Sequence, residues 1–181
     1  MYCEGEASEP DYISALKRLP EIRGNTAINL IIDATAGVPL KLVEKAVARQ
    51  QRDTEIDESW CVFDVEWPRH HPNLDRALRL AAAEGINVAV SNPCFELWLI
   101  LHHQPHTGFL DNRGAEALSS RLDGRQGKRI DGAGYMKLRR DAYIRAEALA
   151  DRHERDGTTF PNDNPSSSMY RLLAAIEGGV I

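Results

Sequence analysis

Short apolar runs rich in β-branched residues alternate with segments of helical period along the first half of the chain. The runs are Ala27 to Ile32, Trp60 to Phe63 and Ile86 to Val90. Nearly continuous apolar strands are expected where helices cover both faces of a sheet. Strands that alternate with helical segments are typical of a parallel sheet with crossover helices. The pattern therefore predicts an α/β fold built on a small parallel sheet.

Two amphipathic helices are expected between these strands, over Leu40 to Gln51 and over Leu74 to Glu84. In each segment, apolar residues recur at the spacing that lines one face of a helix. Asn73 is a suitable N-cap for the second helix, and Gly85 is suited to end it. We expect both helices to pack on the sheet.

The start of the chain leaves little room for a first strand. Only Met1, Tyr2 and Cys3 precede the acidic Glu4, whereas a strand usually has about five residues. Either this strand is unusually short or the true start of the protein lies upstream, and we favour the upstream start. With this strand, the sheet is expected to have about four strands.

After Val90 the sequence becomes mainly helical. Ser91 and Asn92 are suited to cap a helix, and Pro93 suits the first turn of the apolar helix that follows. Segments 124–134 and 158–168 are expected to be loops, because they are polar and contain Gly or Pro. Three further helices are expected, over Arg113 to Leu122, Asp141 to Arg155 and Met169 to Ile176, the last capped by one of three preceding serines.

A chain of 181 residues fits one domain. We expect a sheet core that carries the functional site over residues 1–91 and a helical extension over residues 92–181. The content of 43% apolar and 27% charged residues is that of an ordinary globular protein.

Neither a membrane span nor a secretory signal is expected. The longest apolar run, Leu97 to Leu101, is much shorter than the roughly 20 residues of a membrane span, and the N-terminus is acidic. Cys3, Cys61 and Cys94 are odd in number and far apart. This favours a reducing cytoplasm over a disulfide framework or a zinc site.

The net charge of −5 conceals an asymmetry. Residues 1–66 contain thirteen acidic and seven basic side chains, whereas residues 113–145 contain nine basic and four acidic ones. A basic sub-region can bind phosphate while an acidic crevice holds a metal. A solvated helical face explains the basic excess equally simply, and from charge counts alone we favour that interpretation.

Two acidic motifs follow predicted strands, CEGE at Cys3 to Glu6 and FDVE at Phe63 to Glu66. The carboxyl ends of strands line the ligand crevice in open α/β sheets, and Mg²⁺ prefers carboxylate oxygens. Taken singly, Glu4 could belong to a solvated turn and Asp64 could cap a loop. Together the motifs favour a Mg²⁺ site and metal-assisted chemistry on a phosphate ester.

Four separated segments together resemble one known family. They are CEGEASEPDYISAL (3–16), VFDVEW (62–67), SNPCFELWLILHH (91–103) and NPSSSMYRLLAAI (164–176). Singly, an EGE or DxE string is common. In this order, and with the unusual NPCFELW, the set resembles the RloB family, which is named for its occurrence beside restriction-modification genes.

The resemblance implies a Toprim-like fold, in which a small parallel sheet with helices on both sides carries a Glu after the first strand and a DxD motif after the third. Topoisomerases, primases and overcoming-lysogenization-defect nucleases share this fold and act on phosphodiester bonds with Mg²⁺. On matching positions, Glu4 takes the role of the Glu, while Asp64 and Glu66 take the DxD, with Mn²⁺ as an alternative ion. Glu66 departs from the pattern and puts a second metal in doubt, because Mg²⁺ tolerates poor geometry badly.

Three residues are expected to support this site: Asn92, Glu96 and His102. Asn92 could be a plain N-cap, and Glu96 could be only a partner of the helix dipole. The resemblance instead suggests a buried acid at Glu96 and singles out His102 from its neighbours. Glu6 and Glu9 are interpreted as partners of the dipole of a helix that begins near Pro10.

Lys137, together with Arg139 and Arg140, is the best candidate for contacts with phosphate, although a cluster of charges at a helix end is the simpler interpretation. His70 and His71 follow the FDVE loop and could reach the site. A histidine pair in a loop is, however, more often exposed to solvent.

Two functions remain open. The first is a metal-dependent nuclease of DNA or RNA, which the resemblance places in defence against foreign genetic elements with a partner ABC- or AAA-type ATPase. The second is a non-catalytic subunit that binds Mg²⁺ or a partner protein, which Glu66 and the short first strand support. We expect the acidic oxygens to meet at one edge of the sheet.

Overall fold

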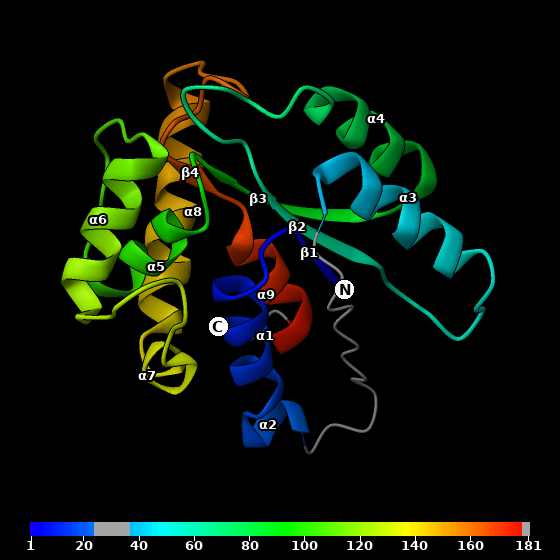
Figure 1. The fold of residues 1–181 in the computed structure, drawn as a ribbon, viewed down its shortest axis with the longest axis horizontal. Coiled ribbons are helices and arrows are strands. Elements are labelled where there is room, and N and C mark those ends of the chain that lie inside the picture. The colour runs from blue at the N-terminus through cyan, green and yellow to red at the C-terminus, as the bar shows by residue number, and fades with distance from the viewer. Residues whose placement is uncertain (24–36, 179–181) are drawn as a thin grey trace.

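The computed structural model describes residues 1–23 and 37–178, and within them it is an α/β fold with a four-stranded, mostly parallel sheet (Figure 1). The strands β1 (Tyr2–Cys3), β2 (Trp60–Asp64), β3 (Asn87–Asn92) and β4 (Ser166–Ser167) lie in this order. The first three strands are parallel, and β4 is antiparallel to β3. The predicted strand Ala27 to Ile32 lies outside the described residues.

Helices cover both faces of the sheet (Figure 1). On one face, α3 (Pro39–Gln50) and α4 (Leu74–Glu84) pack on alternate residues of β2, including the buried Cys61 and Phe63. Val62, between them, points to the other face. This two-sided burial confirms the prediction from the continuous apolar strands.

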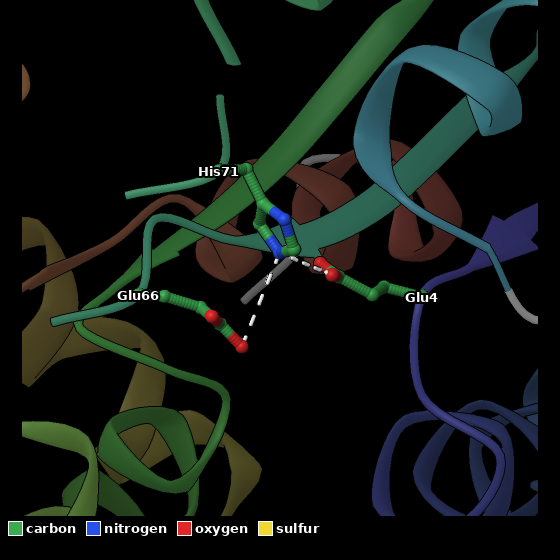
Figure 2. A group of neighbouring side chains, drawn as sticks. All are labelled: Glu4, Glu66 and His71. Carbon is green, nitrogen blue, oxygen red and sulfur yellow. Dashed lines mark ion pairs between the residues drawn. The ribbon is translucent and has the colours of Figure 1, made fainter. Parts of the chain in front are cut away.

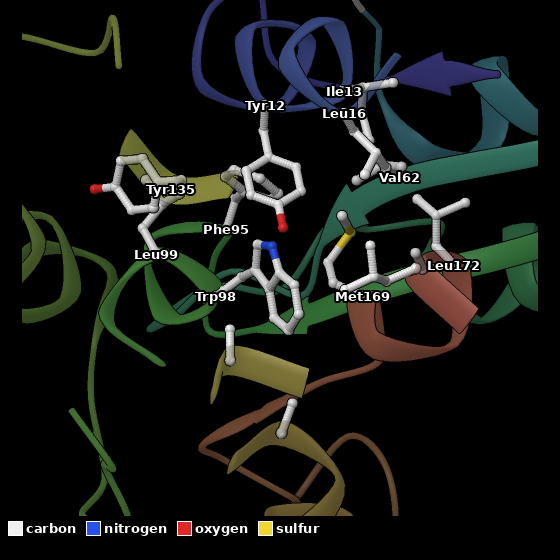
Figure 3. Packing of buried hydrophobic residues seen from close by; sticks show 14 of the residues in the cluster. Tyr12, Ile13, Leu16, Val62, Phe95, Trp98, Leu99, Tyr135, Met169 and Leu172 are labelled. Carbon is white, nitrogen blue, oxygen red and sulfur yellow. The ribbon is translucent and has the colours of Figure 1, made fainter. Parts of the chain in front are cut away.

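The second face of the sheet carries the larger core, to which four long helices contribute together with residues of shorter ones, such as Tyr135 (Figure 3). The four long helices are α1 (Ser8–Lys17), α5 (Glu96–His103), α8 (Arg139–Arg155) and α9 (Met169–Glu177). Trp98 of α5 is fully buried there, and its ring meets that of Tyr12 edge to face at 6.0 Å between centroids. The apolar residues of the helices in the C-terminal half thus form a layer that covers this face of the sheet.

Helix α4 has the predicted bounds and ends as predicted. Gly85 follows it with φ of 67°, a left-handed conformation that glycine adopts without steric cost. Asn73 precedes the helix, but its side chain makes no capping hydrogen bond. The predicted cap is therefore not formed.

The predicted caps at Ser91 and Asn92, with Pro93 in the first turn of a helix, are wrong. Ser91 and Asn92 instead extend β3 and pair with Ser167 and Ser166 of β4, and α5 begins only at Glu96. The Asn92 amide donates to the carbonyl of Pro161 and to Asp163 Oδ1, each at 2.9 Å. The side chain of Asn92, which its local sequence suits to a helix cap, thus forms its hydrogen bonds with residues some 70 positions away.

The C-terminal half contains two elements in segments predicted to be loops. One is β4, and the other is α7 (Gly132–Met136). A Cβ atom on Gly132 would lie 2.5 Å from the Cβ of Ala15, so only glycine allows α7 to pack this closely on α1. Ser168 precedes α9 without capping it, since its hydroxyl accepts from the backbone N–H of Val90.

Two further helices complete the described elements, α2 (Pro20–Arg23) and α6 (Asn112–Asp123). The Asp111 side chain caps α6 by accepting a hydrogen bond from the backbone N–H of Gly114 at 2.7 Å. Among the described helices, none is long and apolar enough to cross a membrane.

Candidate metal centre

The ends of β1 and β2 bring Glu4 and Asp64 into direct contact. In the parallel register Cys3 lies opposite Val62, and the backbone N–H of Glu4 extends the pairing by donating to the Val62 carbonyl at 2.9 Å. Glu4 Oε2 then accepts a hydrogen bond from the backbone N–H of Asp64 at 3.0 Å. Two carboxylates that are 60 positions apart therefore meet at one edge of the sheet.

Glu4, Glu66 and His71 point toward a common centre from three segments of the chain (Figure 2). One potential ligand atom from each lies within 4.8 Å of the other two. His71 Nε2 is 2.5 Å from Glu4 Oε1, at angles outside those of a hydrogen bond, and 3.9 Å from Glu66 Oε1. This is the arrangement of donors that can share one cation.

The backbone turns sharply at Glu66 to present this side chain. Its φ of 65° makes it the one non-glycine residue with positive φ among those that the structure describes. Such a conformation costs roughly 1–2 kcal/mol for an L-residue. Two backbone hydrogen bonds hold it, from Val65 to the Ser91 carbonyl at 3.0 Å and from Glu66 to the Pro93 carbonyl at 2.8 Å. Strain of this kind is characteristic of functional sites.

Asp64 carries a buried oxygen, Oδ1, for which the described residues provide no hydrogen-bond partner. Its pKa is raised well above the usual range of aspartate, chiefly by burial and further by the negative charges of Glu9, Glu4 and Glu96. A hydrogen bond from the backbone of Phe95 acts in the opposite direction but does not offset the burial, and a buried carboxylate oxygen without a partner is costly. A bound cation would remove that cost, so Asp64 fits a metal site better than a loop cap.

Two further acids, Glu9 and Glu96, are buried beside Asp64, with 5% and 8% of their surface exposed. Glu9 Oε1 accepts from the backbone N–H of Gly5 at 3.1 Å, and a Cβ atom on Gly5 would collide with this carboxylate. The pKa of Glu9 is raised, mainly by burial and also by the charge of Glu96. Glu9, interpreted from the sequence as a partner of the helix dipole, thus belongs to the acidic centre.

Arg125 brings a positive charge to one side of this group. Its Nη2 atom is 3.9 Å from Glu96 Oε1, while its Nη1 atom donates to Asp123 at 2.6 Å and to Ser119 at 2.8 Å. Within residues 1–23 and 37–178, no Lys or Arg forms an ion pair with Glu4, Asp64 or Glu66. The acids at the strand ends therefore keep room for a cation.

His102 lies in the aromatic core and contacts none of the candidate ligands among the residues placed in the structure. One ring nitrogen is 2.8 Å from the Trp98 carbonyl, and the other is 3.2 Å from the hydroxyl of Tyr12. Burial lowers its pKa to about 3, so the ring is neutral. It supports the site at most indirectly, by holding α1 against α5.

Asn92 also stays outside the metal cluster, because its amide anchors the segment around Pro161 and Asp163. Glu96 faces the acids, as the prediction of a buried acid requires, and its position in the first turn of α5 also suits the helix dipole. Both interpretations of Glu96 therefore hold together.

The predicted phosphate contacts lie on another part of the surface. Arg139 forms ion pairs with Glu177 at 2.6 Å and with Glu21 at 2.8 Å, which occupies it structurally. Lys137 and Arg140 are exposed. Lys137 and Arg139 line a cavity of about 490 Å³ between α1 and α7, and none of the acids of the metal centre lines it.

Sequence reasoning missed Glu9 and Arg125 as members of the centre and left His71 as an exposed loop residue. Glu9 lies five positions after Glu4, and the glycine between them was the signal that the two acids fold back on each other. His71 and Arg125 had no comparable signal, since only the path of their loops brings them to the sheet edge.

A family model described as RloB-like protein matches residues 1–176, which is nearly the whole chain. The search of curated proteins and the search of solved structures found no match.

Proposed function

The chain belongs to the RloB-like family, and on this basis we propose that it is a divalent-metal-dependent hydrolase of phosphodiester bonds in nucleic acid with a Toprim-like fold. The observation that carries the proposal is the convergence of Glu4, Glu66 and His71 beside the unpartnered buried oxygen of Asp64. Carboxylates grouped in this way at the carboxyl ends of parallel strands suit a cation that binds phosphate.

The donor set fits a divalent ion held by Glu4, Glu66 and His71. Asp64, expected from its motif to be a ligand, is not a member of this group and adjoins it through the contact of its backbone with Glu4. Carboxylate oxygens suit Mg²⁺ and Mn²⁺ alike, whereas an imidazole nitrogen is a poorer ligand for Mg²⁺ than for transition metals. His71 therefore favours Mn²⁺ as the better activator. Mg²⁺, which the motifs alone suggest, remains a proposed ion beside Mn²⁺.

When bound, such an ion neutralises the charge of a phosphodiester and activates a water molecule. The side chains of the chain supply the rest. Asp64 and Glu66 fix the orientation of the site, since one is buried and the other is held by a strained backbone. His71 Nε2, in direct contact with Glu4 Oε1, would hold the ion together with this carboxylate, whose pKa burial raises.

The choice of nucleic acid as substrate, a role in defence and a partner ATPase form part of the proposal through the family resemblance. The exposed Lys137 and Arg140 suit a polyanionic substrate, although they lie on another part of the surface from the acids, whereas Arg125 is buried in its contacts with Asp123 and Glu96.

The experiment that tests the proposal incubates purified protein with plasmid DNA, single-stranded DNA and tRNA, with Mg²⁺, Mn²⁺ or EDTA. We expect metal-dependent cutting that Asp64→Asn and Glu4→Gln abolish. Glu116→Gln, which changes an exposed acid of α6, is the matched control and should cut like the wild type. If the protein binds metal but cuts none of the three substrates, even with its neighbouring ATPase, it is a non-catalytic subunit and the proposal is wrong.

A further inference from the structure

Two large aromatic side chains, Trp67 and Phe109, stay exposed and contact each other. Their exposed fractions are 38% and 59%, and their rings meet edge to face with 5.3 Å between centroids. Rings of this size are usually buried in a soluble protein. A paired exposure of two such rings indicates a surface that is covered when the protein binds something.

The Trp67 ring is held in place before any ligand arrives. The backbone N–H of Trp67 donates to Asn112 Oδ1 at 2.8 Å, which ties the loop to the first residue of α6. Its ring also contacts that of His70, tilted by 56° with 5.6 Å between centroids. A ring held by these contacts loses little conformational entropy on binding.

This aromatic pair adjoins the candidate metal centre. Trp67 directly follows Glu66, and His71 directly follows His70, so the loop of residues 66–71 carries two metal-ligand candidates at its ends and the exposed ring between them. Consecutive Cα atoms are about 3.8 Å apart. The backbone of Trp67 is therefore one Cα step from a candidate metal ligand, in the same loop.

Positive charge accompanies the aromatic pair. Arg69 lies in the same loop, and Arg113 follows Asn112 in α6; both are exposed. In the part of the chain that the structure describes, neither forms an ion pair with a carboxylate. Exposed aromatic rings flanked by arginine are the combination that binds single-stranded nucleic acid by stacking of bases and attraction of phosphates.

We propose that Trp67 and Phe109 form a stacking platform for an unpaired nucleobase next to the scissile phosphate, which makes single-stranded or locally unpaired nucleic acid the substrate class. The proposal rests on the proposed function. In a duplex, both faces of a base are covered by its neighbours, so a ring at the surface can stack only on a base that has left the helix.

The test measures binding of a fluorescein-labelled 12-mer, as a single strand and as a duplex, by anisotropy. The assay contains Ca²⁺ in place of Mg²⁺ or Mn²⁺, so that the carboxylates can hold an ion while its larger and more flexible coordination disfavours cutting. Trp67→Ala should weaken single-strand binding about tenfold, in line with the usual contribution of one stacked base, while Trp67→Phe keeps a ring and should lose less than about threefold. Ile144→Ala, which removes an exposed apolar side chain of α8, is the control and should bind normally.

Equal weakening of single-strand and duplex binding in Trp67→Ala, or no weakening, would overturn the platform. The second result would leave a protein partner as the occupant of the aromatic pair. Both results leave the proposed function intact if the wild type still cuts nucleic acid. Absence of metal-dependent cutting by the wild type, in contrast, removes the proposed function and the platform with it.

Discussion

The aromatic core around His102 and the acidic edge around Asp64 both bury polar side chains, but they do so in opposite ways. Both ring nitrogens of His102 have partners, and its low pKa keeps the ring neutral. Asp64 has a buried oxygen without a partner, in the field of other carboxylates. Trp98 Nε1 in the core also lacks a partner, but an indole N–H is neutral, whereas an unpaired buried carboxylate oxygen is far more costly. The unsatisfied acid at the sheet edge therefore indicates a region built to bind a ligand.

The largest expected effect is the loss of stability in His102→Ala, which changes the aromatic core and leaves the acidic edge intact. The substitution leaves a cavity in the core and removes the partner of the buried Tyr12 hydroxyl. We expect a loss of about 3 kcal/mol in the free energy of unfolding, or a fall of about 6–12 °C in Tm. Calorimetry of the metal-free protein measures this. Metal affinity at temperatures below unfolding should be unchanged, and a tenfold loss there would assign His102 to the site.

Asp64→Asn should change the free energy of unfolding in the opposite direction to His102→Ala. An amide removes the uncompensated negative charge, so the metal-free protein should become more stable, by about 1–2 kcal/mol. The same change should abolish stabilisation by Mn²⁺, which thermal unfolding with and without the ion measures. A metal-free Asp64→Asn protein that is less stable than the wild type would mean that the charge has a partner within the fold.

The stability of the metal-free protein should also depend on pH. Burial raises the pKa values of Glu4, Glu9 and Asp64, so the stability that these carboxyls contribute falls as pH rises. The lowered pKa of His102 acts in the opposite direction below about pH 6.5, because the unfolded state binds a proton that the folded ring does not. Comparison with Glu9→Gln isolates the carboxyl effect: the Tm of this variant relative to the wild type should rise by about 2–4 °C from pH 5 to pH 7, for roughly 1 kcal/mol.

Saturating Mn²⁺ at pH 7 should offset the loss from the carboxyls, because the ion replaces the protons. His102 is unchanged in Glu9→Gln, so its opposite effect cancels in the comparison. A difference in Tm between Glu9→Gln and the wild type that stays constant from pH 5 to pH 7 without metal would contradict the argument.

The smallest expected effect is a change in metal preference. His71→Ala removes the nitrogen ligand but leaves the carboxylates, so affinity for Mn²⁺ should fall roughly tenfold while affinity for Mg²⁺ changes less. Isothermal titration with each ion measures the ratio. His103→Ala, at an exposed position near the end of α5, is the control. Equal losses for both ions would show that His71 positions Glu4 and is not a ligand.

The elements that depend on one segment of chain were predictable from the sequence. The period of Leu74 to Glu84 and the glycine after it define α4, and the apolar run of β2 predicts a strand buried on both faces. The placement of Glu4 and Asp64 at one edge follows from the parallel register of β1 and β2, which the alternation of elements already implied.

Residues whose partners lie far along the chain were not predictable, because their local sequence permits several structures. Ser91 and Asn92 are good helix caps in isolation, yet pairing with β4 makes them strand. The approach of His71 to Glu4, the burial of Glu9 and the contact of Trp67 with Phe109 depend on how loops cross the sheet edge. The sequence by itself determined the fold class and the acids at the strand ends. The reason is that the hydrophobic period of each segment, and the alternation of strands with helices along the chain, can be read without knowing which distant segments pack together. The tertiary structure alone decided which other side chains join them, since burial and charge coupling arise only when distant segments pack together.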